Sequence, residues 1–257
     1  MGEKFLIVAT GFNCSPFVKS CYDSILKQTH KDFIAVLISD GSTDSTARRL
    51  KQLPRHQKIF IEIFSDNQGA ACRRFQAIKK YCSSEKWVVG IMGLDDRLFP
   101  HTLQRINDEY HKGVWMTYGN WVDQYKQGLP KSFPITFPDE IHRERSYRSV
   151  TYRATAMNTF KRFLFDQIPE EDFHLRKEWV LNKEKWIDST TESELVFSCL
   201  EMCGKEKIGV IHDKIYFYNR RLPGGTLARL GTEYKYRILA EIVKRKKKPL
   251  LNGVEIH

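Results

Sequence analysis

The chain has 257 residues and a formal net charge of +11 at pH 7. Its 41% hydrophobic and 28% charged residues are typical of a globular protein, and its length allows one large domain or two small ones. It contains no apolar run of about 18 residues, so we expect no transmembrane helix. The first apolar run, Phe5 to Ala9, is too short for a signal peptide, and none of the six cysteines forms a C-x-x-C pair. We therefore expect a cytoplasmic protein in a reducing compartment.

Part of the positive charge is concentrated near the C-terminus, in the run Lys244 to Lys248. Such a run is either a solvated tail or a contact with an anion, such as an anionic membrane or a lipid-phosphate acceptor. We expect residues 241–257 to form a basic tail, with peripheral membrane contact as one alternative.

Strands and helices are expected to alternate through the first hundred residues. Strands are predicted at Phe5–Ala9, Phe33–Ser39, Ile59–Phe64 and Trp87–Met92, and helices at 15–29, 45–53 and 70–81. Strands separated by helices pair in parallel, and such sheets bind ligands at the carboxyl ends of their strands. The polar residues that follow the four strands should therefore converge on one edge.

The second half has a less regular pattern. Strands are predicted at Val114–Gln124, Lys207–Ile211 and Ile215–Asn219, helices at Tyr152–Phe165 and Glu192–Cys203, and a loop at Gly128–Asp139. No change in composition marks a second domain. We expect one α/β domain, with a mostly parallel central sheet flanked by helices.

The most informative polar residues are Asp95 and Asp96, which follow the fourth predicted strand. Two adjacent carboxylates at the end of a buried strand repel each other and lose hydration. A divalent cation removes both problems, and hard carboxylate oxygens suit Mg²⁺ or Mn²⁺. The alternative is a pair of acidic residues that cap a helix.

A second polar cluster, S-D-G-S-T-D-S-T, begins at Ser39. Asp40 could accept a hydrogen bond from a nucleotide base or a ribose, and Gly41 would let a ligand approach the backbone. The alternative is an Asx turn followed by a helix cap at Thr43 or Asp44.

Two further clusters follow the third and first strands. Asn67 and Gly69 precede a predicted helix in which Arg73 and Arg74 lie one turn later, an arrangement that suits a phosphate-bearing ligand. After the first strand, Thr10-Gly11-Phe12 offers a small residue and an aromatic ring that could flank a base.

Over about Lys4 to Asn107, the chain resembles family two of the glycosyltransferases. The resemblance lies in the order and spacing of four strings: T-G-F-N, I-S-D-G-S-T-D-S-T, D-N-Q-G-x-x-x-R-R and G-L-D-D-x-x-x-P. The resemblance implies a GT-A fold and an inverting enzyme that transfers a sugar from a nucleotide diphosphate sugar to an acceptor hydroxyl. It further implies a nucleotide-binding half, 1–112, and an acceptor-binding half, 113–240, with a glycan, a lipid-linked molecule or a protein as acceptor.

The resemblance also assigns site residues. The nucleotide sugar would be bound by Thr10, Gly11, Phe12, Asp40, Asn67, Gly69, Arg74, Asp95 and Asp96. Asp40 would contact the base, and Asp95 matches the metal-binding Asp of the DXD motif. Asp96 and, as a weaker candidate, His212 would complete the site for Mn²⁺ or Mg²⁺.

Some residues depart from the family pattern. Gly93 replaces the first Asp of the DXD motif, Thr10 replaces a frequent Pro, and Phe75 and Ala77 replace the usual Asn and Gly. These changes leave open a degenerate member that binds a sugar nucleotide without turnover.

The general base is expected near residue 192. The string Thr191-Glu192-Ser193-Glu194-Leu195 resembles the Glu-Asp-x-Glu-Leu string of the family. The Asp of that string is the general base of the family, and Glu192 occupies its place. A carboxylate there would take the acceptor proton during attack. Asp188 and Glu194 are the alternatives, and a merely structural acidic cluster at a helix start is another.

Two other features concern substrates. The loop Arg220–Thr226 could form a lid over the diphosphate or be a simple basic loop. Trp115, Tyr118 and Trp121 follow a strand period, so one face should pack in the core while the other could stack on an acceptor sugar.

Two rival functions explain less of the sequence. A nucleotidyltransferase would have a Gly-rich signature with Arg and Lys after the first strand, which Thr10 to Asn13 lacks. A basic nucleic-acid-binding protein would not gather Asp40, Asp95 and Asp96 at the strand ends, where they repel phosphate. We therefore expect no nucleic-acid partner.

Overall fold

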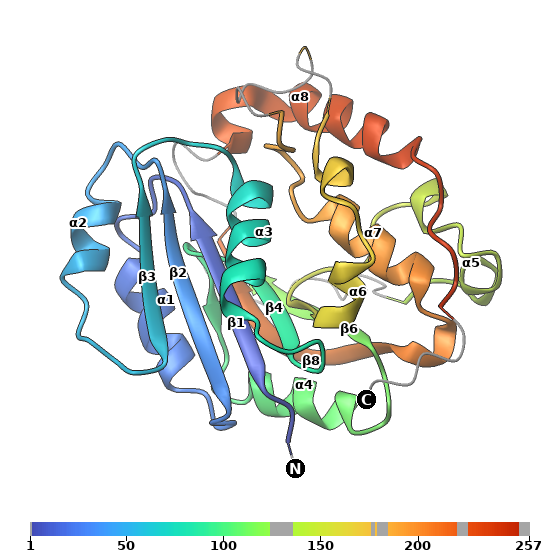
Figure 1. Ribbon diagram of the computed structural model, residues 1–257, viewed down its shortest axis with the longest axis horizontal. Coiled ribbons are helices and arrows are strands. Elements are labelled where there is room, and N and C mark those ends of the chain that lie inside the picture. Colours follow the sequence, from blue (N-terminus) through green and yellow to red (C-terminus); the bar gives the residue numbers. More distant parts are fainter. Residues whose placement is uncertain (1, 124–135, 176–177, 179–184, 220–225, 252–257) are drawn as a thin grey trace.

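The computed structural model describes residues 2–123, 136–175, 178, 185–219 and 226–251. Its centre is an eight-stranded sheet in the order β3-β2-β1-β4-β7-β6-β8-β5, with helices on both faces (Figure 1). The strands are β1 (Phe5–Gly11), β2 (Phe33–Asp40), β3 (Ile59–Phe64), β4 (Val88–Gly93), β5 (Arg97–Leu98), β6 (Met116–Asp123), β7 (Asn158–Lys161) and β8 (Ile208–Tyr218). The predicted α/β fold is confirmed.

The helices connect and cover these strands. The α-helices are α1 (Val18–Leu26), α2 (Thr46–Lys51), α3 (Ala70–Tyr81), α4 (Thr102–Tyr110), α5 (Asp139–Glu144), α6 (Arg162–Asp166), α7 (Ser193–Met202) and α8 (Thr226–Val243), and short 3₁₀ turns are η1 (Tyr147–Ser149), η2 (Glu170–Phe173) and η4 (Lys205–Lys207). Among the described helices, none is both long and apolar enough to span a bilayer.

The first half of the chain forms the parallel part of the sheet, as predicted. β1 pairs in parallel with β2 and β4, and β2 pairs in parallel with β3. β1 has buried residues along almost its whole length, which is typical of a strand covered on both faces. One boundary differs, because α1 begins at Val18 rather than at Ser15. The Ser15 backbone N–H bonds to Asp44 instead, at 3.2 Å.

The second half contains the main error of prediction. Residues 152–165 were expected to form one helix, but Asn158–Lys161 form β7, which pairs antiparallel with β4 and β6. Only the short α6 follows. Thr159 and Phe160 are fully buried in the middle of the sheet, so pairing with distant strands overrides the local helical pattern. The two strands predicted at 207–219 are one strand, β8, with irregular register opposite Asn120.

Two apolar cores lie on opposite faces of the sheet. One core contains Leu6 and Val8 of β1 with residues of α3 and α7, and the other contains Ile7 of β1 with residues of α1 and α4. Figure 1 shows α3 and α7 on the near face, with α8 across the end at which β1 and β2 finish. Because β1, β2, β4, β6 and β8 run in the same direction, their carboxyl ends form one edge.

The segment after α8 returns along α7 and is part of the fold. The Leu251 N–H donates to the Met202 carbonyl at 3.0 Å, and Arg245 lies 3.2 Å from the Glu194 carboxylate. Over its described residues, the segment predicted as a basic tail therefore packs against the domain.

Candidate active site

The loops after β1 and β2 are joined by hydrogen bonds. The Asn13 amide oxygen accepts the backbone N–H groups of Thr43 at 2.9 Å and Asp44 at 3.2 Å. The Thr46 N–H donates to Asp44 at 2.8 Å. Partial burial raises the pKa of the Asp44 carboxyl, but hydrogen bonds from Thr46 and Ser15 outweigh it and lower that pKa overall. Much of the S-D-G-S-T-D-S-T string therefore shapes its own loop, as the Asx-turn alternative proposes.

Asp40 lies at the end of β2 and is buried. Its carboxylate accepts N–H groups from Gln68 at 3.1 Å and Gly69 at 2.8 Å, and the Arg73 Nε at 2.7 Å. The Asn67 side chain donates to the Asp40 carbonyl at 2.8 Å. Asp40, Asn67 and Gly69 are thus brought together as predicted. The partner of Asp40 is Arg73, which the sequence analysis did not identify. Arg74, the predicted ligand-binding arginine, lies elsewhere. A base contact by Asp40 stays a prediction.

Two glycines allow this close approach. Gly41 has φ of 67°, and a Cβ there would lie 2.4 Å from the Asn67 nitrogen. Gly69 has φ of 91°, and its Cβ would lie 3.3 Å from the Asp188 Cα. Both positions therefore favour glycine, and the second brings the segment before α7 against the start of α3.

The last two residues of β1 and Phe12, which follows them, line the same edge. Thr10 is buried, and its hydroxyl has no hydrogen-bond partner among the described residues. A Cβ on Gly11 would lie 2.6 Å from the Cys14 sulfur and 2.7 Å from the Leu94 Cβ, so glycine allows the ends of β1 and β4 to pack closely. Phe12 is partly buried beside them.

Gly93, Asp95 and Asp96 form a compact turn after β4. A Cβ on Gly93 would lie 2.6 Å from the Asp95 Oδ1 and 2.7 Å from the Asp96 Oδ2, so both carboxylates fold over the glycine. Asp96 accepts the Tyr216 hydroxyl at 2.6 Å and the Asn219 N–H at 2.7 Å. Both oxygens of Asp96 therefore hold β8 to β4, and Asp95 is the better placed of the two to bind a cation.

The electrostatics of this turn are unfavourable without a counterion. Burial raises the pKa of Asp95 to about 6, although its own N–H and the charge of Arg74 act in the opposite direction. Burial and the charge of Asp95 hold the pKa of Asp96 well above its ordinary range, against hydrogen bonds from Tyr216 and Asn219. A divalent cation would relieve this repulsion. Asp95 therefore fits a metal ligand.

The described residues do not supply a complete metal-binding set. Within them, no three His, Cys, Asp or Glu side chains gather around one point. His212 lies on an exposed part of β8, four residues before the Tyr216 that contacts Asp96. Its role as a ligand stays a prediction that these contacts do not support. A cation at Asp95 would need further oxygens from a diphosphate or water.

Arg74 contacts the residues that precede α7. Its Nη1 donates to the Thr191 hydroxyl at 3.1 Å and lies 3.8 Å from the Glu192 Oε2. Its charge also acts on Asp95, whose pKa it lowers. Side chains from α3 and from the start of α7 are therefore in contact, and the turn after β4 lies within electrostatic range of them. The Glu192 side chain is 38% exposed, so it is open to a reactant.

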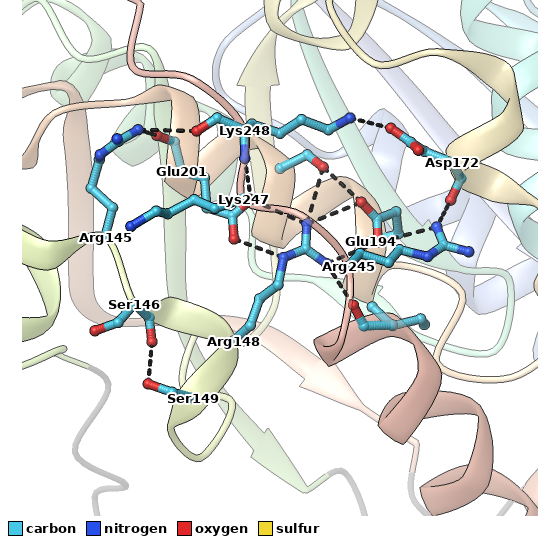
Figure 2. A network of polar contacts seen from close by, with 12 residues as sticks. Arg145, Ser146, Arg148, Ser149, Asp172, Glu194, Glu201, Arg245, Lys247 and Lys248 are labelled. Carbon is cyan, nitrogen blue, oxygen red and sulfur yellow. Dashed lines mark hydrogen bonds and ion pairs between the residues drawn. The ribbon is translucent and has the colours of Figure 1, made fainter.

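The two alternative bases have other partners. Glu194 is 1% exposed and is held by both Nη atoms of Arg148, at 2.9 and 3.0 Å (Figure 2). Asp188 accepts the Tyr234 hydroxyl with both oxygens, at 2.8 and 2.9 Å. Glu192 therefore remains the best candidate.

Trp115, just before β6, and Tyr118 and Trp121, within it, have different surroundings. Trp115 and Tyr118 are buried and belong to the core. Trp121 contacts Tyr218 edge to face, with ring centres 5.3 Å apart, and Tyr218 is 42% exposed. A stacking surface for a sugar is thus limited to Trp121 and Tyr218. Residues 220–225 of the predicted lid lie outside the described residues.

Curated proteins resemble this chain in sequence. The glycosyltransferase GlyA of Streptococcus pneumoniae serotype 4 is 21% identical over 254 residues, which cover 90% of this chain and 32% of GlyA. The chain spans about a third of the length of the first curated relatives that it matches.

Solved structures share its fold. Residues 1–349 of S. aureus TarS, in complex with UDP-GlcNAc, align with a TM-score of 0.66 and 17% identity, covering 93% of this chain and 65% of that one. Glucosyl-3-phosphoglycerate synthase from Mycobacterium tuberculosis, in complex with Mn²⁺, UDP and glucosyl-3-phosphoglycerate, aligns with a TM-score of 0.59 and 12% identity, covering 95% of this chain and 81% of that one. These likenesses confirm the GT-A fold.

The family model described as glycosyl transferase family 2 matches residues 6–169, more than half of the chain. This match includes Asp40, Arg74 and Asp95, whose arrangement is described above. The chain therefore belongs to glycosyl transferase family 2.

Proposed function

We propose that this glycosyltransferase moves one hexose from a nucleotide diphosphate sugar to an acceptor hydroxyl, with inversion and with help from a divalent cation. The observation that carries the proposal is the Arg74–Glu192 pair at 3.8 Å, whose arginine charge acts on Asp95 at the carboxyl edge of the sheet. The acceptor would be a glycan, a lipid-linked molecule or a protein. The UDP-GlcNAc bound to TarS supports a UDP-sugar as the first donor to test.

Each of the three side chains has a role in this proposal. Glu192 takes the proton of the acceptor hydroxyl, whose oxygen attacks the anomeric carbon. The bond between that carbon and the diphosphate breaks on the opposite side, so the configuration inverts. Arg74, which its hydrogen bond to Thr191 orients, would compensate the charge of the departing diphosphate.

Asp95 would hold Mn²⁺ or Mg²⁺ together with diphosphate oxygens. Its raised pKa and its position over Gly93 support this assignment. The bound cation would supply compensation for negative charge on the diphosphate. Asp96 contributes indirectly, because it fixes the end of β8 beside Asp95.

Calorimetric titration with UDP, GDP and TDP, with and without Mn²⁺, tests the donor site. We expect one nucleotide to bind in a Mn²⁺-dependent way to the wild type, and this binding to be lost in Asp95→Ala. An absence of binding to all three nucleotides would reject the donor-site assignment.

Turnover tests the base. With the donor that binds, Glu192→Gln should keep nucleotide affinity and lower kcat by about 10² to 10⁴. Glu206→Gln, an exposed carboxylate in η4, is the matched control and should retain activity. Nucleotide-sugar binding with neither transfer nor hydrolysis in the wild type would favour the degenerate alternative.

A further inference from the structure

A charged concavity lies between η1, α7 and the segment that follows α8 (Figure 2). We call it the basic hollow. It has a volume of about 370 Å³ and is lined by four basic side chains, those of Arg145, Arg148, Arg245 and Lys247, and by the Glu201 carboxylate. Positive charge therefore exceeds negative charge in its wall.

Two of these cations are neutralised within the protein. The guanidinium of Arg148 donates to Glu201 at 2.7 Å and to Glu194 at 2.9 Å, and it also donates to the Ile242 carbonyl. Arg245 lies 3.2 Å from the Glu194 carboxylate. Both glutamates are 1% exposed, so these pairs form the buried base of the hollow.

The other two cations have carbonyl partners instead. Arg145 Nη1 donates to the Glu201 and Lys248 carbonyls at 2.8 and 3.0 Å, and the Lys247 ammonium donates to the Glu144 carbonyl at 2.7 Å. Neither Arg145 nor Lys247 has a described carboxylate within 4.0 Å. A carbonyl fixes the position of a cation but carries no net charge, so both positive charges remain uncompensated.

The fixed geometry of Arg145 favours a particular anion. Its backbone has φ of 51°, in the left-handed region, and its Nη1 is anchored to two carbonyls. The Nε and Nη2 donors of the same planar group make no hydrogen bond to the described part of the chain. Two such donors match two oxygens of one phosphate, and the flexible Lys247 can meet a third. Ser149, exposed at the end of η1, also lines the hollow, and its hydroxyl donates to the Ser146 carbonyl at 2.7 Å.

The basic hollow is separate from the proposed donor site. Glu201 follows Glu192 by nine residues of α7, which corresponds to about 13 Å along a helix. A phosphate bound by Arg145 and Lys247 near Glu201 would therefore lie well away from the proposed base Glu192. We propose that the basic hollow binds the phosphate group of a phosphate ester, with Arg145 and Lys247 as its ligands. This site does not depend on the proposed transferase activity.

Calorimetric titration of the whole chain with inorganic phosphate and glycerol 3-phosphate tests the site. Lys247→Gln removes one ligand, and Ser149→Asp places a negative charge in the wall, so each should weaken binding about tenfold or more. Lys246→Gln makes the same charge change at the neighbouring exposed residue, outside the lining, and should alter affinity less than about twofold. Thermal unfolding of each variant checks that it is folded.

Three results would overturn the proposal. The first is that the wild type binds neither phosphate compounds nor lipid vesicles. The second is that Lys246→Gln weakens phosphate binding as much as Lys247→Gln does. The third is that Arg74→Gln abolishes phosphate binding, which would place the phosphate at the donor site. Because the last variant alters only the donor site, failure of the hollow and failure of the proposed transferase are distinguishable.

Vesicles identify the source of the phosphate. If the protein cosediments with phosphatidic acid vesicles but not with phosphatidylcholine vesicles, and Ser149→Asp abolishes this binding, the ligand of the hollow is a lipid headgroup. Glycerol 3-phosphate binding without vesicle binding would assign a soluble ester. Either result supports the hollow as a phosphate site.

Discussion

Replacing Gly93 by alanine tests the compact turn that holds both aspartates. The family has an Asp here, and restoring a side chain would seem to improve the site. The geometry predicts the reverse. The new Cβ would lie 2.6 Å from the Asp95 Oδ1 and 2.7 Å from the Asp96 Oδ2, whereas ordinary contact begins at 3.4 Å. Each carboxylate must therefore move by about 0.7 Å.

The two aspartates differ in how easily they can move. Asp95 is partly buried. Asp96 is buried and accepts bonds of 2.6 Å from Tyr216 and 2.7 Å from Asn219. Weakening one hydrogen bond to a charged group costs about 1.5–3 kcal/mol. For a chain of this size, that corresponds to a fall in Tm of about 3–12 °C.

Thermal unfolding of Gly93→Ala measures this cost, and Gly204→Ala is the matched control. A Cβ on Gly204 would meet only the Leu250 Cδ1, at 3.9 Å, so this variant should unfold near the wild-type temperature. Mn²⁺-dependent nucleotide binding should also weaken in Gly93→Ala, because Asp95 is displaced. Equal Tm values for the two variants, with unchanged nucleotide affinity in both, would show that the carboxylates do not fold over Gly93.

Three further predictions follow from single contacts. Mn²⁺-dependent nucleotide binding should strengthen as the pH rises through about 6, where Asp95 loses its proton. In a pH titration of this binding, Arg74→Gln should move the midpoint upward, because it removes a charge that lowers the pKa of Asp95. Arg148→Met should lower the free energy of unfolding by about 3–5 kcal/mol in denaturant titrations, since it leaves the buried Glu201 without its cation and Glu194 with Arg245 alone. Lys19→Met, which breaks an exposed pair, should cost about 1 kcal/mol or less. Tyr218→Ala should raise the acceptor KM in transfer assays without changing donor affinity, and an unchanged acceptor KM would exclude it as a stacking residue.

The sequence predicted the first half of the fold well because its signals there are local. β1 and β2 are continuous apolar runs, and each is followed by turn residues that end it. β7 was missed for the opposite reason. Asn158–Lys161 is short, and its status as a strand depends on β4 and β6, which lie far away in the chain.

The candidate site shows the same limit at single residues. Arg73 and Arg74 are adjacent on α3, and only the rotation of that helix decides that Arg73 reaches Asp40 while Arg74 faces Glu192. The two adjacent arginines in the sequence predict neither the rotation of the helix nor the partner of each side chain. The C-terminal run is similar, because Arg245 finds its partner Glu194 only through the fold.

Helix α7 relates the two sites proposed here. Glu192 precedes its first turn and contacts Arg74, whereas Glu194, two positions later, faces the buried pairs beneath the basic hollow. Two positions on a helix differ by about 200°, so one face of the helix can hold the reacting carboxylate while the opposite face anchors the helix. The ion pairs of Glu194 and Glu201 with Arg148 span seven residues of that anchored face. The direction in which Glu192 points therefore depends on a network that includes Arg245, a residue of the C-terminal segment.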